Sequence, residues 1–288
     1  DCPPLPTILG YEVVGRVHAA GKDVTDFEVG QRVVSSTRFG GYAEYAVADA
    51  RAAAVIPEDM DYCVAAALAT QYATAYYCAA YTTQLHKGEH VLIQAAAGGV
   101  GTALVQIAKS KGCIVYGTAG SEEKLEYLRT LGVDHPINYN TTDFAAYIEK
   151  KSGKNAIDVA FDSLGGSAVK KARKLLAIGT GRIVCYGAAS RSGRAKGILG
   201  DLKLVFGFGF LASVELLLKS QGVIGVNMSH IADNRPEAFK YCIQNVVKLV
   251  EEGTLSPTIG GKFAVEDISK AHEFLGGRKS IGKVAVHW

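Results

Sequence analysis

This chain of 288 residues has little net charge and no long uninterrupted apolar run. Its 31 Lys and Arg oppose 28 Asp and Glu, and no basic cluster stands out, which argues against a nucleic-acid partner. The longest apolar stretch, 202–218, contains Lys203 and Glu215. Its clean part, 204–214, is too short for the roughly 20 residues of a transmembrane helix. We interpret the stretch as a buried helix or loop; the alternatives are an apolar wall at a substrate site or a weak peripheral membrane contact.

Paired cysteines and metal-ligand patterns are also missing. None of the six cysteines lies in a Cys-x-x-Cys pair, and most stand in apolar stretches, so we expect small buried thiols in a reducing, cytoplasmic compartment. Among the seven histidines, His86 and His90 are four residues apart. The Lys-Gly-Glu between them is typical of a turn and not of one helix face. The sequence therefore predicts no metal site.

The pattern of short apolar segments divides the chain into three parts. Short β-prone runs at 11–19, 32–36, 42–47 and 52–56 indicate a small sandwich or partial barrel, and a helical pattern covers 61–80. Strands then alternate with helices such as 99–111 and 122–131, which indicates a parallel sheet covered on both faces. These strands are expected at 90–94, 113–117, 136–139, 157–161, 182–186 and 222–226. We predict an α/β protein with a β-rich domain (1–70), a Rossmann doubly wound sheet (71–235) and a segment returning to the first domain (236–288).

A glycine-rich loop follows the buried strand Val91-Leu92-Ile93. Its sequence is a variant of the dinucleotide-binding fingerprint, in which small residues allow a tight turn, close approach to a pyrophosphate and packing of the next helix. The N-terminus of that helix offers N–H groups and a positive dipole end to phosphates. A tight turn without a ligand is the alternative. We predict that a dinucleotide binds along this loop, which consists of Ala96, Ala97, Gly98, Gly99, Val100 and Gly101.

The end of the next expected strand, 113–117, favours NADPH over NADH. An NAD site normally has an Asp or Glu about 20 residues after the loop, but the stretch 116–121 has no acid. Ser121 offers a hydroxyl and Lys124 a countercharge to a 2′-phosphate, whereas Glu122 and Glu123 oppose it. Alternatively, Ser121 only caps the next helix and Lys124 is a solvated surface charge.

Several motifs resemble the medium-chain dehydrogenase/reductase superfamily from Leu9 to the C-terminus, most of all its quinone oxidoreductase branch and the related vesicle amine transport protein homologues. The zinc alcohol dehydrogenases of this superfamily carry a metal-binding histidine where this chain has Tyr11, and a phenol is not a usual zinc ligand. The resemblance thus implies a zinc-independent enzyme with a Rossmann sheet and a GroES-like catalytic domain. It also implies an N-terminally incomplete chain. The motifs are 10–15, 23–32, 39–45, 162–166, 186–190 and 279–284.

The resemblance also implies roles for individual residues. Gly120, Lys124 and Tyr139 match positions around the 2′-phosphate and adenine ribose, and Arg278 or its neighbour Lys279 matches a basic position that reaches the same cofactor. Thr74 and Gly187 match positions on the nicotinamide side. Structural alternatives are a packed Tyr139, a core hydroxyl at Thr74 and a solvated Arg278.

These observations predict reduction of quinones or other α,β-unsaturated carbonyls by NADPH, without a metal. The alternatives are an enoyl-thioester reductase and a nucleotide-binding, membrane-associated protein with little turnover. The expected partners are a small apolar carbonyl or quinone and, by resemblance, a second copy joined through 222–226. No proton donor is assigned. The candidate substrate-pocket residues are Tyr11, Thr74, Phe206, Phe208 and Phe210.

Overall fold

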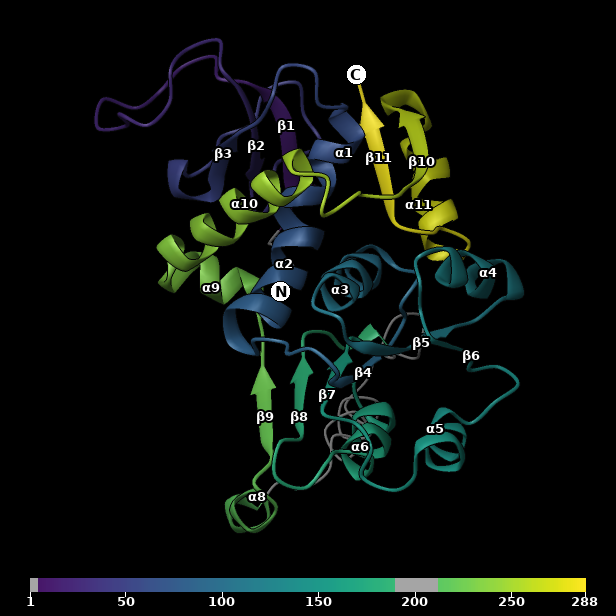
Figure 1. Cartoon of the computed structure of the whole chain (residues 1–288). Helices are drawn as coiled ribbons and strands as arrows, with labels where there is room; N and C mark the ends of the chain where they lie inside the picture. Colours follow the sequence, from purple (N-terminus) through teal and green to yellow (C-terminus); the bar gives the residue numbers. More distant parts are fainter. Residues whose placement is uncertain (1–4, 190–211) are drawn as a thin grey trace. The chain divides into compact units, whose positions relative to one another are not determined.

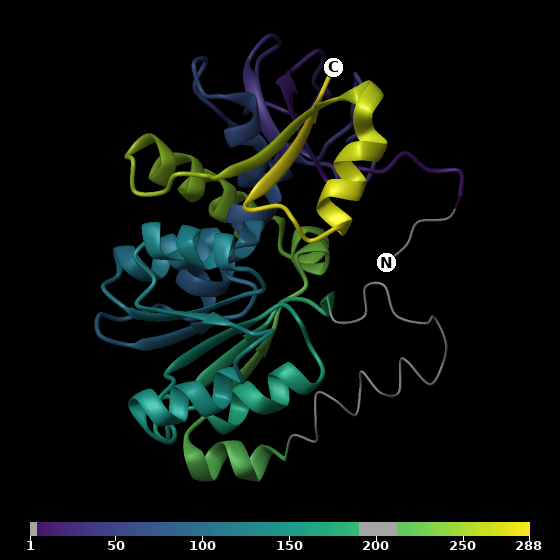
Figure 2. The ribbon, with the colours of Figure 1, turned by 90° about the vertical axis from the view of Figure 1, so that its right-hand side faces the viewer.

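The computed structural model describes residues 5–189 and 212–288, which form two compact units (Figures 1 and 2). Unit 1 comprises Asp1–Tyr77, Gly98–Ala103 and Met228–Trp288, and unit 2 comprises Cys78–Ala97 and Leu104–Asn227. The domain boundaries predicted at residues 70 and 235 stay a prediction.

Unit 2 contains a six-stranded parallel sheet in the order β6-β5-β4-β7-β8-β9. In Figure 1, helices α3 and α4 lie on one side of this sheet and α5 and α6 on the other. This is the predicted doubly wound arrangement. Its strands are β4 (His90–Ile93), β5 (Ile114–Ala119), β6 (His135–Asn138), β7 (Val159–Asp162), β8 (Arg182–Cys185) and β9 (Gly222–Gly225). Its helices are α4 (Glu122–Thr130), α5 (Phe144–Ser152), α6 (Ser167–Lys174), α8 (Ser213–Lys219) and most of α3 (Gly99–Ser110), whose residues up to Ala103 are counted with unit 1.

Burial on both faces explains why β4 is apolar at successive positions. Val91, Leu92 and Ile93 are all fully buried, as expected for a central strand of a covered parallel sheet. On one face, Leu92 joins Tyr116 and Ile137 in a cluster that includes residues of α5 and α6. The apolar run that looked like a buried strand in the sequence therefore forms the middle of the sheet.

The strand order determines where the loops of unit 2 diverge. β4 pairs with β5 on one side and β7 on the other, so the chain runs outward in opposite directions from β4. The loops that follow β4 and β7 thus leave the carboxyl edge of the sheet in opposite directions. Open α/β sheets bind ligands at such a switch point.

Unit 1 contains an antiparallel sheet in the order β1-β2-β3, a parallel pair β10-β11, and helices around them. Asp61 caps α1 by accepting from the backbone N–H groups of Cys63 and Val64, and Pro236 begins α10. The helical run predicted at 61–80 is present, with two π-helical turns, η2 and η3. The strands are β1 (Glu12–Arg16), β2 (Arg32–Ser36), β3 (Ala53–Val55), β10 (Ile259–Ala264) and β11 (Lys283–His287). The helices are η1 (Ala50–Ala52), α1 (Tyr62–Ala67), η2 (Leu68–Tyr72), α2 (Ala73–Tyr76), α9 (Met228–Asn234), α10 (Pro236–Glu251), η5 (Val265–Asp267) and α11 (Ile268–Gly276). The turn η3 (Tyr77–Thr82) begins at the last residue of the segment Asp1–Tyr77 and otherwise belongs to unit 2.

The structure corrects two expectations. Residues 42–47 form bends and irregular backbone instead of a strand, because a β-prone sequence still needs a neighbouring strand and this segment pairs with none in the described ranges. The described end of the apolar stretch forms α8, where Leu217 and Leu218 are 77% and 78% exposed, so this part is not buried. Its candidate lid residues Phe206, Phe208 and Phe210 lie outside the described residues.

Four of the cysteines lie in the core. Cys63, Cys78, Cys113 and Cys242 are buried free thiols, which confirms their interpretation as small core residues. Within the two described ranges, no helix has the length and hydrophobicity needed to cross a membrane.

Replacing Leu92 by alanine tests the central packing of the sheet. Leu92 is fully buried in the α5–α6 face of unit 2, so the substitution leaves a cavity and should lower the free energy of unfolding by about 2–5 kcal/mol. Leu217→Ala, on the exposed face of α8, is the matched control and should change it by no more than about 0.5 kcal/mol. Urea unfolding followed by circular dichroism measures both values, and equal effects would contradict the assigned core.

The buried carboxyl at the end of β7 should affect how stability varies with pH. Asp162 is 0% exposed, and its Oδ2 has no hydrogen-bond partner among the described residues. Burial raises the pKa of this carboxyl, although the backbone N–H groups of Gly165 and Leu164 oppose the shift. The folded state therefore holds the proton more tightly than the unfolded chain, whose Asp pKa is about 3.9. The contribution of Asp162 to stability falls as pH rises from that value through the raised pKa.

Asp162→Asn should remove this loss, so the unfolding free energy of the wild type should decline relative to the variant as pH rises above about 4. Asp26→Asn is a control of opposite sign. A hydrogen bond from Lys240 lowers the pKa of Asp26, so its contribution is lost as pH falls. Urea unfolding at several pH values measures both trends. If the free energy of unfolding of the wild type rises relative to that of Asp162→Asn as the pH rises, the pKa of Asp162 is not raised by folding.

Candidate functional site

The glycine loop forms a tight turn directly after β4. Gln94 N–H donates to the Phe161 carbonyl at 3.0 Å, which holds the strand end against β7. Ala95 has a positive φ of 51°, and its N–H donates to the Thr118 hydroxyl at 3.1 Å. Helix α3 begins at Gly99, so the loop runs into a helix N-terminus whose first N–H groups have no partner inside the helix. This is the context that the fingerprint requires.

Small residues are needed in and beside this turn. A Cβ on Gly117 of β5 would lie 3.1 Å from the Ala96 Cβ. A Cβ on Gly99 would lie 2.1–2.3 Å from the carboxamide atoms of Gln71. The buried Oε1 of that carboxamide has no hydrogen-bond partner in the described part of the chain. The close packing explains the small residues independently of any ligand.

The C-terminal segment also reaches the glycine loop. Gly98 and Gly282 form an isolated parallel bridge, and Arg278 lies four residues before Gly282. Arg278 itself is exposed, with a φ of 56°, in the turn that follows α11. The structure therefore brings the predicted basic residue of the tail into the neighbourhood of the loop, on the same unit as Gly98.

The loops after β5 and β6 meet around Gly120. Tyr139 N–H donates to the Ala119 carbonyl at 3.1 Å, and the Asn140 side chain donates to the Gly120 carbonyl at 2.7 Å. A Cβ on Gly120 would lie only 2.4 Å from the Tyr139 hydroxyl, so the phenol packs on a surface that glycine alone provides. Tyr139 remains 44% exposed. The predicted adenosine residues are thus together at neighbouring strand ends.

Lys124 stands at the first turn of α4 beside these residues. Ser121 is the N-cap of this helix, accepting from the Lys124 N–H at 3.4 Å, as the structural alternative predicted. Burial lowers the pKa of the half-buried Lys124 ammonium, while Glu123 acts in the opposite direction. Glu122, the other acid, is paired with Arg129 at 2.9 Å. A partly desolvated cation beside a strand end without an acid is suited to a phosphate.

Loops after β7 and β8 pack together on the other side of the switch point. Ala189 N–H donates to the Ser163 carbonyl at 2.9 Å, and a Cβ on Gly187 would lie 2.8 Å from that carbonyl oxygen. Asp162 Oδ1 accepts from the Gly165 N–H at 2.6 Å, which shapes the turn. Gly187 is therefore required for the contact of the two loops.

The candidates of unit 1 fall into two groups. Thr74 is buried and donates to the Thr70 carbonyl at 2.6 Å, as the core-hydroxyl alternative predicted. Tyr11 is 51% exposed, and its ring centroid lies 5.3 Å from that of Phe39. Together with Arg38, Thr70 and Ser229 these two aromatic residues line a pocket of about 250 Å³, which we call the Tyr11 pocket.

Sequence analysis selected only Tyr11 from this pocket. Arg38 and Phe39 stand at the start of the 39–45 motif, but only the fold shows that they face the same space as Thr70 and Ser229. No periodicity connects a residue before β1 and two residues after β2 with residues of η2 and α9. A weak signal was the single arginine directly before an aromatic residue and two glycines.

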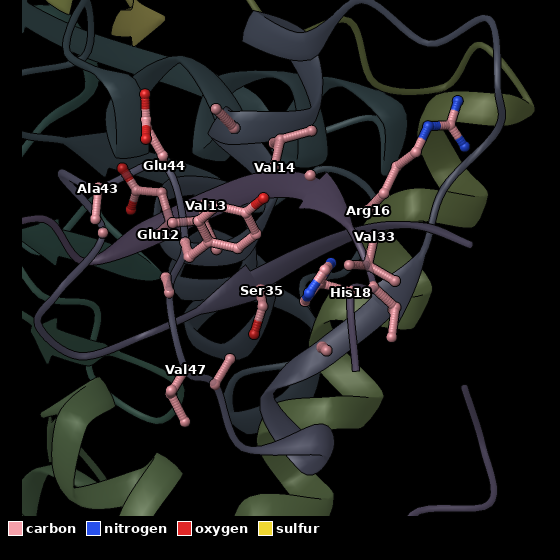
Figure 3. A pocket seen from close by; sticks show the side chains of 18 of the residues that line it. Glu12, Val13, Val14, Arg16, His18, Val33, Ser35, Ala43, Glu44 and Val47 are labelled. Carbon is pink, nitrogen blue, oxygen red and sulfur yellow. The ribbon is translucent and has the colours of Figure 1, made fainter. Parts of the chain in front are cut away.

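A larger cavity of about 1290 Å³ lies in unit 1 along β1, residues 42–50 and β11 (Figure 3). Its polar side chains include Glu12, Glu44, His18 and Ser35, which Figure 3 shows on the lining elements. Glu12 is paired with the buried Lys283, so its charge is compensated. None of the predicted site residues that lie within 5–189 and 212–288 lines this cavity, and it exceeds the roughly 300–1,000 Å³ of ordinary ligand pockets.

Residues 5–189 and 212–288 contain no group of three or more His, Cys, Asp or Glu side chains that could hold a metal ion. The site described above consists instead of glycines, hydroxyls, aromatic rings and basic side chains.

Comparisons with known proteins address both parts of the chain. The family model for the alcohol dehydrogenase GroES-like domain matches residues 1–58, and that for zinc-binding dehydrogenases matches residues 99–247. The human synaptic vesicle membrane protein VAT-1 homolog is 34% identical over 99% of this chain and 72% of its own length. A 2-haloacrylate reductase from a Burkholderia species is 32% identical over 98% of this chain and 81% of its own.

A solved structure gives the same result. The quinone oxidoreductase of Escherichia coli, complexed with NADPH, superimposes with a TM-score of 0.83 at 26% identity, covering 99% of this chain and 84% of the other. The predicted fold class, a Rossmann sheet with a GroES-like part, is confirmed. On these matches, which span nearly all of its residues, the chain belongs to the medium-chain dehydrogenase/reductase superfamily of oxidoreductases, together with the quinone oxidoreductases and VAT-1 homologues that it resembles.

Proposed function

We propose that this protein transfers hydride from NADPH to a quinone or another α,β-unsaturated carbonyl, without a metal ion. The observation that carries the proposal is the strand end after β5. There Gly120 and Tyr139 form a surface beside the half-buried Lys124, no carboxylate occupies residues 116–121, and the glycine loop follows the neighbouring strand.

The residues present fit an NADPH molecule. The loop from Ala96 to Gly101 and the N-terminus of α3 would hold the pyrophosphate. Lys124 and Ser121 would hold the 2′-phosphate, with Tyr139 and Gly120 against the adenosine. In unit 1, Arg278 is the candidate basic residue for the same cofactor. Gly187, in the loops after β7 and β8, would adjoin the nicotinamide half. NADPH, when bound, supplies the hydride, and the protein positions the reactants and excludes water.

The Tyr11 pocket supports a flat acceptor. Two aromatic rings, Tyr11 and Phe39, line it with the Thr70 and Ser229 side chains. A planar conjugated carbonyl suits such a surface, because aromatic faces pack against flat π systems. Relatives are named for two acceptors of this kind, a quinone and a 2-haloacrylate.

Zinc independence is supported by the residue at position 11. A tyrosine stands where the zinc members of the superfamily carry a histidine, and it packs on Phe39. A phenol is not a usual zinc ligand.

We further propose that the enzyme acts in the cytoplasm as a homodimer of two-domain subunits. β9 lies at the edge of the six-stranded sheet, and a second copy that paired with it there would cover the backbone groups of that edge.

Oxidation of the nicotinamide cofactor by the intact protein tests the proposal directly. Rates with NADPH and NADH should be compared for a quinone, an enone and an enoyl thioester, each with and without a metal chelator. We expect turnover that prefers NADPH, is insensitive to the chelator and is fastest with the quinone or the enone. A faster rate with the thioester would favour an enoyl-thioester reductase. Loss of activity in chelator would contradict the zinc-independent mechanism, and binding of NADPH without turnover would favour a nucleotide-binding protein.

Lys124→Ala tests the assignment of the 2′-phosphate site. Losing a charge-assisted contact should raise the Kd of NADPH about tenfold and leave the Kd of NADH nearly unchanged, since NADH has no 2′-phosphate. Lys170→Ala, an exposed lysine on α6, is the matched control and should affect neither value. Titration of cofactor fluorescence measures these constants. Equal weakening of both cofactors would show that Lys124 acts through folding and not through the phosphate.

A further inference from the structure

The Tyr11 pocket contains a charge that already has a partner. Arg38 is the only one of its five lining residues with a permanent charge, alongside Tyr11, Phe39, Thr70 and Ser229. Both carboxylate oxygens of Asp233 accept hydrogen bonds from Arg38 Nη1, at 2.9 and 2.8 Å. The positive charge of Arg38 in the pocket is thus compensated by the carboxylate of Asp233, which is not one of the lining residues.

The fold holds this pair at the pocket from two elements. Ser229 and Asp233 are four residues apart in α9, so they lie on one face of that helix, Ser229 lining the pocket and Asp233 binding Arg38. Arg38 has a φ of 63°, and the next residue donates its N–H to the Thr37 carbonyl at 2.7 Å. This turn fixes the direction in which the Arg38 side chain leaves the backbone.

We propose that the Arg38–Asp233 pair sets the charge preference of the pocket, so that it takes neutral flat carbonyl compounds in preference to free conjugated acids. The inference rests on the proposed function, because it names the class of acceptor. An anionic ligand would share Arg38 with Asp233 and be repelled by that carboxylate, whereas a neutral quinone or enone needs no countercharge. The relatives include an enzyme named for an acid, 2-haloacrylate, and others named for quinones, so the distinction matters within the family.

Benzamide and benzoate are suitable probes, because they have nearly the same size and shape and differ in charge. Isothermal titration of the full chain gives the ratio of the benzoate Kd to the benzamide Kd. We expect a ratio above one for the wild type. Asp233→Asn leaves Arg38 without its carboxylate and should lower the ratio about fivefold, the upper range for an exposed ion pair. Arg38→Met leaves Asp233 alone and should raise the ratio, and the double variant should return it to near the wild-type value.

Two further variants control for location and stability. Tyr11→Ala should weaken both probes equally, because the ring contacts either one. Asp26→Asn removes another exposed ion pair, Asp26–Lys240 at 2.6 Å, whose residues do not line the pocket, and it should leave the ratio unchanged. The melting temperature of each variant identifies any loss of folding. If Asp233→Asn does not fold, the change in the Kd ratio caused by Arg38→Met still tests the proposal.

The inference is overturned by a wild type that prefers benzoate, by a ratio that neither Asp233→Asn nor Arg38→Met changes, or by binding of neither probe. The probes are not reduced, so their binding is independent of turnover. If the variants change the Kd ratio as expected but none of the acceptors supports oxidation of NADPH, the proposed function is refuted and the charge preference stands. If the protein reduces a quinone but the variants leave the Kd ratio unchanged, the proposed function stands and the charge preference is refuted.

Discussion

The parallel pairing of β4 with β5 on one side and β7 on the other is the constraint on which the nucleotide site depends. β4 can occupy the centre of the sheet because its three consecutive apolar side chains, Val91, Leu92 and Ile93, are buried on both faces. β5 and β6 lie on one side of β4, and β7, β8 and β9 lie on the other. The loops after β4 and β7 therefore diverge at the carboxyl edge of the sheet. The glycine loop is placed at the divergence by the core and not by contacts with a ligand.

Charge compensation distinguishes the residues available to a ligand from those that stabilise the fold. Glu122 is paired with Arg129, Glu12 with Lys283, and Arg38 with Asp233, and each pairing limits what its members can do for a bound molecule. Lys124 is half-buried, and burial lowers the pKa of its ammonium while the nearby Glu123 opposes the shift. We therefore propose a phosphate ligand beside Lys124 and a neutral carbonyl compound in the Tyr11 pocket.

Local patterns were sufficient for much of this protein. A buried strand, a glycine loop and a helix follow one another within about twenty residues, so their geometry depends on short-range chain connectivity, and the same holds for the missing acid after β5. Alternation of strands and helices likewise determines a parallel sheet, since consecutive parallel strands need a crossover. The hydrogen bonds by which Ser121 caps α4 and Thr74 binds the Thr70 carbonyl were visible only in the structure, because each depends on the position of one side chain.

What the sequence by itself determined is therefore the fold class and the place of the glycine loop, both of which arise from neighbours in the chain. The phosphate site at the end of β5 stays a prediction drawn from the same local pattern. Only the tertiary structure decided which apolar segments are paired or covered: 42–47 has the composition of a strand but lacks a partner, and α8 exposes its leucines. The tertiary structure also forms the Tyr11 pocket, where Arg38 binds the carboxylate of Asp233, 195 residues away in the sequence. Contacts over such separations arise from the packing of whole elements, and no local pattern encodes them.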